Sequence, residues 1–161
     1  MVDSFIKILD PNFLSAETMS APEMVLTIKD IDFADCYDDQ QKKTVSKQTL
    51  FFEETLPMVL NKTNAKMLKR LFSPGEDNPS LCVGHKIVVT TEKVKAFGKV
   101  WDALRLKEYS EVKCEQCGKE ILPVSGKTVA QLVEISVRNT KKTLCVECMR
   151  KFKEQKEKEN G

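Results

Sequence analysis

The sequence has no long apolar segment. None of its apolar runs approaches the roughly 20 residues that a helix needs to cross a bilayer. Asp3 stands where a secretory signal peptide would carry lysines, and no long apolar stretch follows it. The hydrophobic content of 41% is still enough for most of the 161 residues to fold. We therefore expect a cytoplasmic protein that makes no membrane contact and keeps its thiols reduced.

Motifs that carry catalysis are also missing. The sequence contains no P-loop, no GxSxG and no HExxH. Its one histidine, His85, is more typical of a strand start or a surface position than of a site, and Cys36 and Cys82 are interpreted as ordinary thiols. The acidic residues at 38–39 and 53–54 are adjacent in sequence, so on a strand their side chains point to opposite faces. We expect a protein that is not an enzyme.

Charge is unevenly distributed along the chain, although the net charge is only +2. The residues before 57 include 11 acidic and 5 basic side chains, whereas residues 57–109 include 10 basic and 5 acidic ones. A basic section of this kind can face a polyanion, and it can equally be a solvated surface of mixed sign.

Strand patterns fill the first half of the chain. Residues 24–36 alternate with period two, which predicts a strand of about ten residues with Ile31 and Phe33 on one face and Leu26 and Ile28 on the other. The polar segment 37–47 predicts a hairpin loop, and residues 48–54 predict the returning strand. A third apolar run follows at 56–60.

A single helix is expected next, from the segment "NKTNAKMLKRLF", where Asn61, Thr63 or Asn64 can provide the N-terminal cap. Two or three strands are then expected, with segments at 86–91, 93–97 and 100–106 and a tight turn at Gly98-Lys99. Five short strands with one helix between the third and fourth match an oligonucleotide-binding barrel, which is mainly β. Another small barrel or an α+β sheet fits the pattern nearly as well.

Two Cys-x-x-Cys pairs stand out in the C-terminal part, separated by 27 residues. Each pair places two sulfurs on one side of a tight turn, and two pairs complete the tetrahedron that Zn²⁺ accepts. Four cysteines fill every position of a structural zinc site, while redox pairs or free thiols are the alternative. The predicted ligands are Cys114, Cys117, Cys145 and Cys148.

The segment between the pairs is longer than in common zinc modules, so we expect it to contain its own structure. Thr128 and Gln131 form a possible capping box, which predicts a helix over 129–138. The second pair opens a charged C-terminal helix. We therefore expect an N-terminal arm at 1–21, a barrel at 22–109 and a small zinc-ribbon or finger module containing helix at 110–161.

The barrel region resembles a group of small phage and prophage proteins. The residues that carry the resemblance are "LNKTNA" at 60–65, then Gly84, Lys86 and Ile87, then Phe97, Gly98, Ala103 and Arg105. The group is similar to single-stranded-DNA-binding proteins of the oligonucleotide-binding class, and it implies a role in replication or recombination inside a bacterial host cell. The sequence departs from the group at 81–85, where other members often carry a tryptophan.

The C-terminal unit resembles a four-cysteine module, "CxxCGkeI…LCxxCxxk", found at the end of other phage proteins of DNA metabolism. That resemblance implies a second nucleic-acid contact or a docking site for a partner protein, without deciding between them.

Single strands are held by basic grooves and by aromatic faces on which bases stack. The stacking candidates are Phe51, Phe97, Trp101 and Tyr109, and a place in the barrel core is the alternative for Phe51 and Trp101. The predicted nucleic-acid-binding residues are Lys86, Lys93, Lys95, Lys99, Trp101, Arg105 and Phe97.

Two other functions stay open. The chain can be a protein-interaction adapter or an inhibitor of a host nuclease or defence complex, because its aspartates at 30, 32, 35, 38 and 39 offer a nucleic-acid-like acidic surface. It can also be an accessory subunit of a recombinase or replisome. Steep salt dependence of oligonucleotide binding favours single-stranded-DNA binding, and affinity for a basic protein surface favours the adapter.

Overall fold

The computed structural model of the protein describes residues 12–38 and 40–161. The chain divides into two units, each with its own apolar core. The first unit contains Met24–Tyr109 and residues 12–20, and the second contains Ser110–Gly161 and Ala21–Glu23. Residues 1–11 of the predicted arm lie outside the described residues. In the described part of the arm, Leu14 is buried and its N–H donates to the carbonyl of Pro57 over 2.7 Å.

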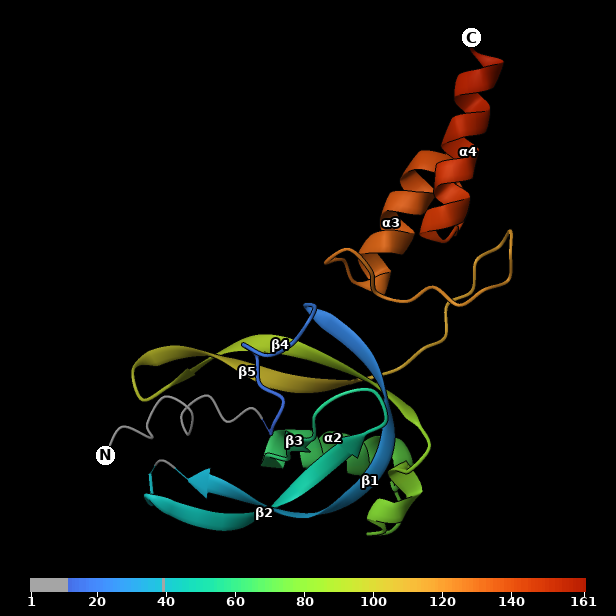
Figure 1. Cartoon of the computed structure of the whole chain (residues 1–161). Coiled ribbons are helices and arrows are strands. Elements are labelled where there is room, and N and C mark those ends of the chain that lie inside the picture. Colours follow the sequence, from blue (N-terminus) through green and yellow to red (C-terminus); the bar gives the residue numbers. More distant parts are fainter. Residues whose placement is uncertain (1–11, 39) are drawn as a thin grey trace. The chain divides into compact units, whose positions relative to one another are not determined.

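The first unit is mainly β (Figure 1). Its strands are β1 (Glu23–Asp38), β2 (Lys43–Phe52), β3 (Met58–Val59), β4 (Lys86–Ala96) and β5 (Lys99–Glu108). They form one sheet in the order β3-β2-β1-β4-β5, with antiparallel hairpins between β1 and β2 and between β4 and β5. Helix α2 (Lys62–Phe72) and the 3₁₀ helix η1 (Pro79–Cys82) lie between β3 and β4 in the chain.

The predicted order, five strands with one helix after the third, is therefore confirmed. The closed oligonucleotide-binding barrel stays a prediction, because β3 and β5 are the two edges of the sheet and no pairing between them is found in the described part of the chain. The expected break between two strands near Thr91 is wrong, since β4 runs without interruption from Lys86 to Ala96.

A bulge in β1 decides which side chains reach the core. The pairing of β1 with β2 shifts its register between Ile28 and Asp30, and a bulge reverses the facing of the residues that follow it. Leu26 and Ile28 are buried before the bulge, and Ile31 packs against the same core after it. The strict alternation predicted for this strand, with Ile31 opposite Ile28, is therefore wrong beyond residue 28.

Helix α2 is anchored to β5 by Asn64, which is 1% exposed. The Asn64 side chain donates from Nδ2 to the carbonyl of Leu104 over 3.0 Å and accepts at Oδ1 from the N–H of Leu106 over 3.2 Å. These two backbone groups lie on the side of β5 that no strand covers. The Asn61 side chain caps the helix by accepting from the N–H of Asn64 over 2.9 Å, so one of the predicted caps is confirmed.

The second unit contains two helices, α3 (Val129–Thr140) and α4 (Val146–Glu159). The predicted capping box of α3 is present, because Thr128 accepts from the N–H of Gln131 and Gln131 accepts from the N–H of Thr128. The helix ends at Lys141, whose φ of 61° is left-handed. A small core forms around Leu144, Leu132 and Ile121, together with the buried cysteines.

Candidate metal centre and nucleic-acid interface

The four predicted cysteine ligands come together in the second unit. Their Sγ atoms all lie within 4.8 Å of one another. Cys114 and Cys148 are buried, Cys145 is half-buried and Cys117 is exposed. The cysteine cluster is therefore covered by protein on the side of Cys114 and Cys148 and is exposed to solvent at Cys117.

Local turns explain how two short segments converge on one point. The N–H of Gly118 donates to the carbonyl of Cys114 over 2.9 Å, and Gly118 takes a φ of 71°, which lets the chain fold back beneath the sulfurs. The second pair uses a helix instead of a loop. Cys145 is the N-cap residue of α4 and Cys148 lies in its first turn, so both thiols project at the start of that helix.

Hydrogen bonds between the two segments hold the pairs in register. The N–H of Glu115 donates to the carbonyl of Thr143 over 2.9 Å, and the N–H of Thr143 donates to the Glu115 carboxylate. The buried hydroxyl of Ser136 donates to the carbonyl of Lys142 and accepts from the N–H of Leu144 over 2.8 Å. This places the end of α3 against the loop that leads into the second pair, so the sulfur positions depend on α3 as well.

The thiols have different proton affinities. Burial works against ionisation of Cys114, yet backbone N–H groups of Cys117 and Cys145 outweigh it and lower the pKa of Cys114 to about 6. Burial and hydrogen bonds to the other three thiols raise the pKa of Cys148 to about 12. One thiolate therefore forms readily, whereas the last forms against the negative charge of its neighbours. A cation at the centre of the cluster removes this conflict.

The arrangement fits a tetrahedral metal site. The Sγ atoms of Cys117 and Cys145 are 3.8 Å apart, far beyond the length of a disulfide, which is about 2.0 Å. Metal–sulfur bonds of about 2.3 Å in a tetrahedron would place the sulfurs about 3.8 Å apart. Four sulfur donors at this spacing can hold a metal ion that takes thiolate ligands.

The predicted nucleic-acid-binding residues lie mostly on the hairpin of β4 and β5, but they do not share one face. Lys93 pairs across the hairpin with Asp102, and Val94 pairs with Trp101. Because successive pairs alternate between faces, Lys93 and Lys95 lie on the face that continues the core. Lys86, Lys99, Trp101 and Arg105 lie on the opposite face by the same alternation, so the predicted residues are divided between the two faces of the hairpin.

Aromatic side chains near the hairpin turn are exposed. Phe97 is 94% exposed and Trp101 is 54% exposed, which excludes the alternative that Trp101 fills the core. The Trp101 indole N–H makes a weak hydrogen bond to the carbonyl of Ala96 at 3.4 Å, which holds the ring near the turn. Phe51 is only half-buried in β2, and Tyr109 lies beneath Lys86, whose Nζ is 5.3 Å from the ring centre.

The basic side chains of the hairpin differ in whether they form ion pairs. Lys93 pairs with Asp102 at 3.1 Å and Arg105 pairs with Glu92 at 2.9 Å. Lys95 and Lys99 are exposed and form no ion pair with any described residue. The tip of the hairpin therefore has two unpaired ammonium groups beside Phe97 and Trp101.

Sequence reasoning missed the aromatic residues of the other long hairpin. Phe33 is 68% exposed and Tyr37 is 38% exposed. Both lie on the face of β1 that contains Ile31, on the part of the strand that extends past the core. Phe33 belongs to the strand predicted over 24–36, where alternation gives its face but not its exposure, and Tyr37 was assigned to the predicted loop at 37–47.

The turn of this hairpin is held by Asp38. Its carboxylate accepts from the N–H groups of Gln40 and Gln41 over 2.9 and 3.0 Å, and it pairs with Lys47 at 3.0 Å. The hydrogen bond from Gln41, followed by the contact with Lys47, holds the pKa of Asp38 below its ordinary value, and the same contact raises the pKa of Lys47. The predicted loop at 37–47 is therefore wrong: residues up to 38 and from 43 are strand.

Comparisons with protein-family models, with curated proteins and with solved structures return no match to this chain. In the part of the chain that the structure describes, none of the helices combines the length and apolar character needed to cross a membrane. Any function therefore has to be argued from the cysteine cluster and the two hairpins themselves.

Proposed function

We propose that the protein binds single-stranded DNA without sequence specificity, in replication or recombination, and that a structural zinc ion holds its C-terminal unit together. One observation carries the proposal. Two strand hairpins extend past the core of the first unit, and they expose three large aromatic side chains, Phe33, Phe97 and Trp101, with lysines next to the latter two.

This combination suits a single strand because every base has an aromatic face and every nucleotide has a phosphate. Stacking of one base on an aromatic side chain contributes about 1–3 kcal/mol and tolerates any sequence. Lys95 and Lys99 can meet phosphates directly. Lys93 is held by an exposed ion pair, which contributes about 0–1 kcal/mol, so a phosphate can replace its carboxylate partner at small cost. Arg105 is half-buried and also donates to the carbonyl of Leu104 over 3.2 Å, so it is held more firmly.

The order of the elements supports the proposal. In the oligonucleotide-binding class, ligands lie across the sheet between the loop after the first strand and the loop that joins the fourth and fifth strands. In this chain those loops are the ends of the two long hairpins. Such barrels are partly open, which is compatible with the unpaired edges of β3 and β5.

The zinc part of the proposal follows from the donor set. Four thiolates suit zinc, and they leave no open position for a water molecule, so the ion supplies folding energy and not catalysis. The cysteines, the capped helix α3 and the start of α4 would form one structural unit around it. The proposed function therefore needs no enzymatic step.

The test uses Trp101, the only tryptophan of the chain, as a natural probe. A 30-nucleotide oligothymidine is titrated into the zinc-loaded protein while tryptophan fluorescence is recorded at several salt concentrations. We expect saturable quenching. The slope of log affinity against log salt concentration should be about −3 if four basic side chains contact phosphates. Absence of quenching and of anisotropy change at low salt would overturn the proposal.

Matched variants locate the contact. Lys95→Glu should weaken binding at least tenfold, because it places a carboxylate at the hairpin tip. Arg70→Glu introduces the same charge change on α2, outside both hairpins, and should change affinity less than twofold. Equal weakening by the two variants would show a general charge effect and not a binding surface.

A second candidate function rests on a separate observation. Asp30, Asp32 and Asp35 are exposed along β1. By strand alternation Asp35 lies on the face of Phe33 and the other two lie on the opposite face, so the hairpin presents carboxylates on both faces. An adapter or an inhibitor of a host nuclease would use these carboxylates to mimic nucleic acid. It becomes the better explanation if the protein fails to bind oligothymidine yet competes with it for a basic nucleic-acid-binding protein.

A further inference from the structure

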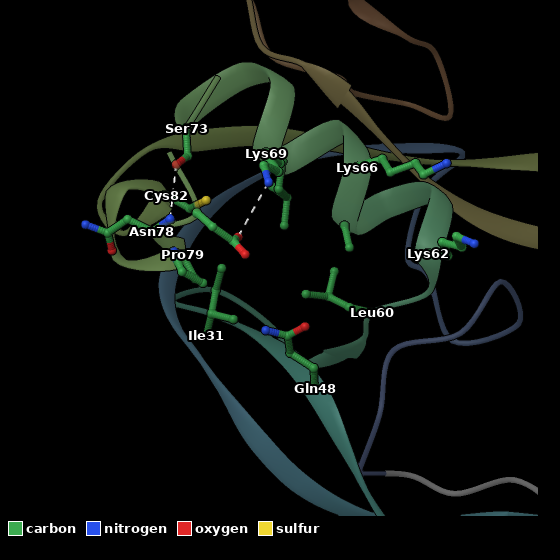
Figure 2. Close-up of a pocket in the computed structure, with 13 residues that line it drawn as sticks. Ile31, Gln48, Leu60, Lys62, Lys66, Lys69, Ser73, Asn78, Pro79 and Cys82 are labelled. Atoms are coloured by element: carbon green, nitrogen blue, oxygen red, sulfur yellow. Dashed lines mark hydrogen bonds and ion pairs between the residues drawn. The ribbon is translucent and has the colours of Figure 1, made fainter. Parts of the chain in front are cut away.

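A pocket of about 280 Å³ lies in the first unit, between α2, η1 and the paired strands β1 and β2. Its apolar lining comes from Ile31, Leu60, Ala65, Leu68 and Cys82. Figure 2 shows Ile31 of β1 and Leu60, which follows β3, below the helix, with Gln48 beside Leu60. The pocket therefore has an apolar floor that belongs to the rigid core of the unit.

Three lysines of α2 line the same pocket. Lys62, Lys66 and Lys69 follow one another at intervals of four and three residues, so they share one side of the helix. In Figure 2, Lys62 and Lys66 lie at one end of the pocket with their ammonium groups pointing outward, away from Ile31 and Leu60, while Lys69 pairs with Asp77 at 3.9 Å. Lys62 and Lys66 form no ion pair with any described residue, so two ammonium groups at that end are available to a ligand.

The lining argues against several ligands. No aromatic side chain lines the pocket, so a base has nothing to stack on. Its volume is at the lower limit of the roughly 300–1,000 Å³ that small-molecule sites occupy. A space of this size instead takes one or two apolar side chains, and the lysines add a preference for negative charge beside them.

We infer that this pocket docks an acidic segment of a partner protein, which inserts a leucine, isoleucine or phenylalanine above Ile31 and Leu60 and sets flanking carboxylates against Lys62 and Lys66. Charge complementarity selects the segment, and burial of the apolar side chain fixes its register. The inference does not depend on single-strand binding, because the exposed hairpin tips are not part of the pocket lining.

The experiment selects peptides without assuming their sequence. A library of random 12-residue peptides displayed on phage is panned against the full-length, zinc-loaded protein, and enriched peptides are synthesised with a fluorescent label. We expect sequences with two or more acidic residues around one large apolar residue, and micromolar or weaker affinity in fluorescence anisotropy. No enrichment, or enrichment of peptides without carboxylates, would overturn the inference.

Three variants test the position of the bound peptide. Lys62→Glu/Lys66→Glu should weaken binding at least tenfold, and Arg70→Glu, on the same helix but outside the lining, should leave it within twofold. Ala65→Leu fills the pocket without changing charge and should weaken binding at least fivefold. Thermal melting checks that each variant stays folded.

Two results would overturn the inference here. If Ala65→Leu folds and binds the peptides normally, the apolar floor is not the site. If oligothymidine displaces the peptides, and the double lysine variant loses oligonucleotide affinity while Arg70→Glu keeps it, the lysines contact nucleic acid instead. In either case a peptide-docking role of the pocket is wrong.

Discussion

Asn64 shows how one side chain completes the edge of a sheet. Strand β5 has a neighbour on only one side, which leaves backbone groups that need partners. The Asn64 amide offers a donor and an acceptor at the spacing of these groups, and it bonds both Leu104 and Leu106 from a fully buried position. One side chain of the 11-residue helix α2 thus makes the two backbone hydrogen bonds that a neighbouring strand would otherwise make.

Removal of this amide should therefore be costly. Asn64→Ala leaves the buried N–H of Leu106 and the carbonyl of Leu104 unpaired, so we expect a loss of about 3 kcal/mol in the free energy of unfolding. Urea denaturation followed by tryptophan fluorescence measures it. Thr63→Ala changes the exposed neighbour on the same helix and should stay within about 0.5 kcal/mol. Equal stability of the two variants would contradict the bridging role.

The sequence predicts the N-terminal cap of α2 but not the hydrogen bonds from Asn64 to β5. A cap among Asn61, Thr63 and Asn64 follows from local chemistry, because a helix N-terminus needs a side-chain acceptor within three residues. The bond from Asn64 to β5 spans about 40 positions of the chain. No local pattern distinguishes an asparagine that caps from one that reaches a distant strand, since both are short amides at the start of a helix.

At the scale of elements, the hairpins were harder to predict than the helices. Helix α3 was correctly predicted from its capping box and its apolar stripe, which are local. Strands β1 and β2 extend several residues past the core, and there they lose the alternation of apolar and polar residues that marks a half-buried strand. The bulge at Ile28 adds a change of register that alternation alone cannot locate.

Phe97 combines backbone strain with exposure. It takes a φ of 52°, and Gly98 takes 73°, so the two-residue turn between β4 and β5 has both residues in the left-handed region. Glycine and asparagine suit this conformation, whereas a bulky aromatic residue does not. A residue that is strained and 94% exposed contributes little to the fold, which points to a role in binding.

Phe97→Asn should consequently separate stability from function. We expect the melting temperature to rise by a few degrees, corresponding to about 0.5–1 kcal/mol, because asparagine adopts the left-handed region more easily. Affinity for oligothymidine should fall by about 5- to 100-fold, since one stacking face is lost. Calorimetry and the fluorescence titration measure the two effects. A stabilised variant with unchanged affinity would place Phe97 outside the interface.

For the whole molecule, cysteine spacing predicts which thiols come together, whereas residue type alone does not predict which face of a hairpin a side chain occupies. The four cysteines are assigned by spacing alone, because chelation requires two thiols on each tight turn, and their sulfurs do converge. The lysines and aromatics were predicted from their residue type and their position in the chain. Their actual faces depend on strand register, on the bulge and on how far each hairpin extends, and these are properties of the folded sheet.

Separate cores predict separate responses to metal removal. The core of the first unit contains none of the four ligands, whereas the core of the second is built around Cys114 and Cys148. We expect a unit of about 50 residues with so few buried apolar side chains to need a metal ion at its cysteine cluster to stay folded. Treatment with a strong chelator should therefore raise amide hydrogen exchange throughout α3 and α4 and leave β2 and β4 protected. Exchange is carried out on the full-length protein and measured by mass spectrometry of its peptic peptides.

Serine variants distinguish loss of the ion from other effects of the chelator. Cys117→Ser removes one ligand, so it should lower the bound zinc below one ion per chain and unprotect α3 and α4 without any chelator. Cys36→Ser changes a cysteine of the first unit and should retain one zinc ion and normal protection. If chelation also unprotects β4, the first unit depends on the metal-bound one, and the two cores are not independent. If neither treatment changes exchange in α3 and α4, the cysteine cluster does not hold a structural metal.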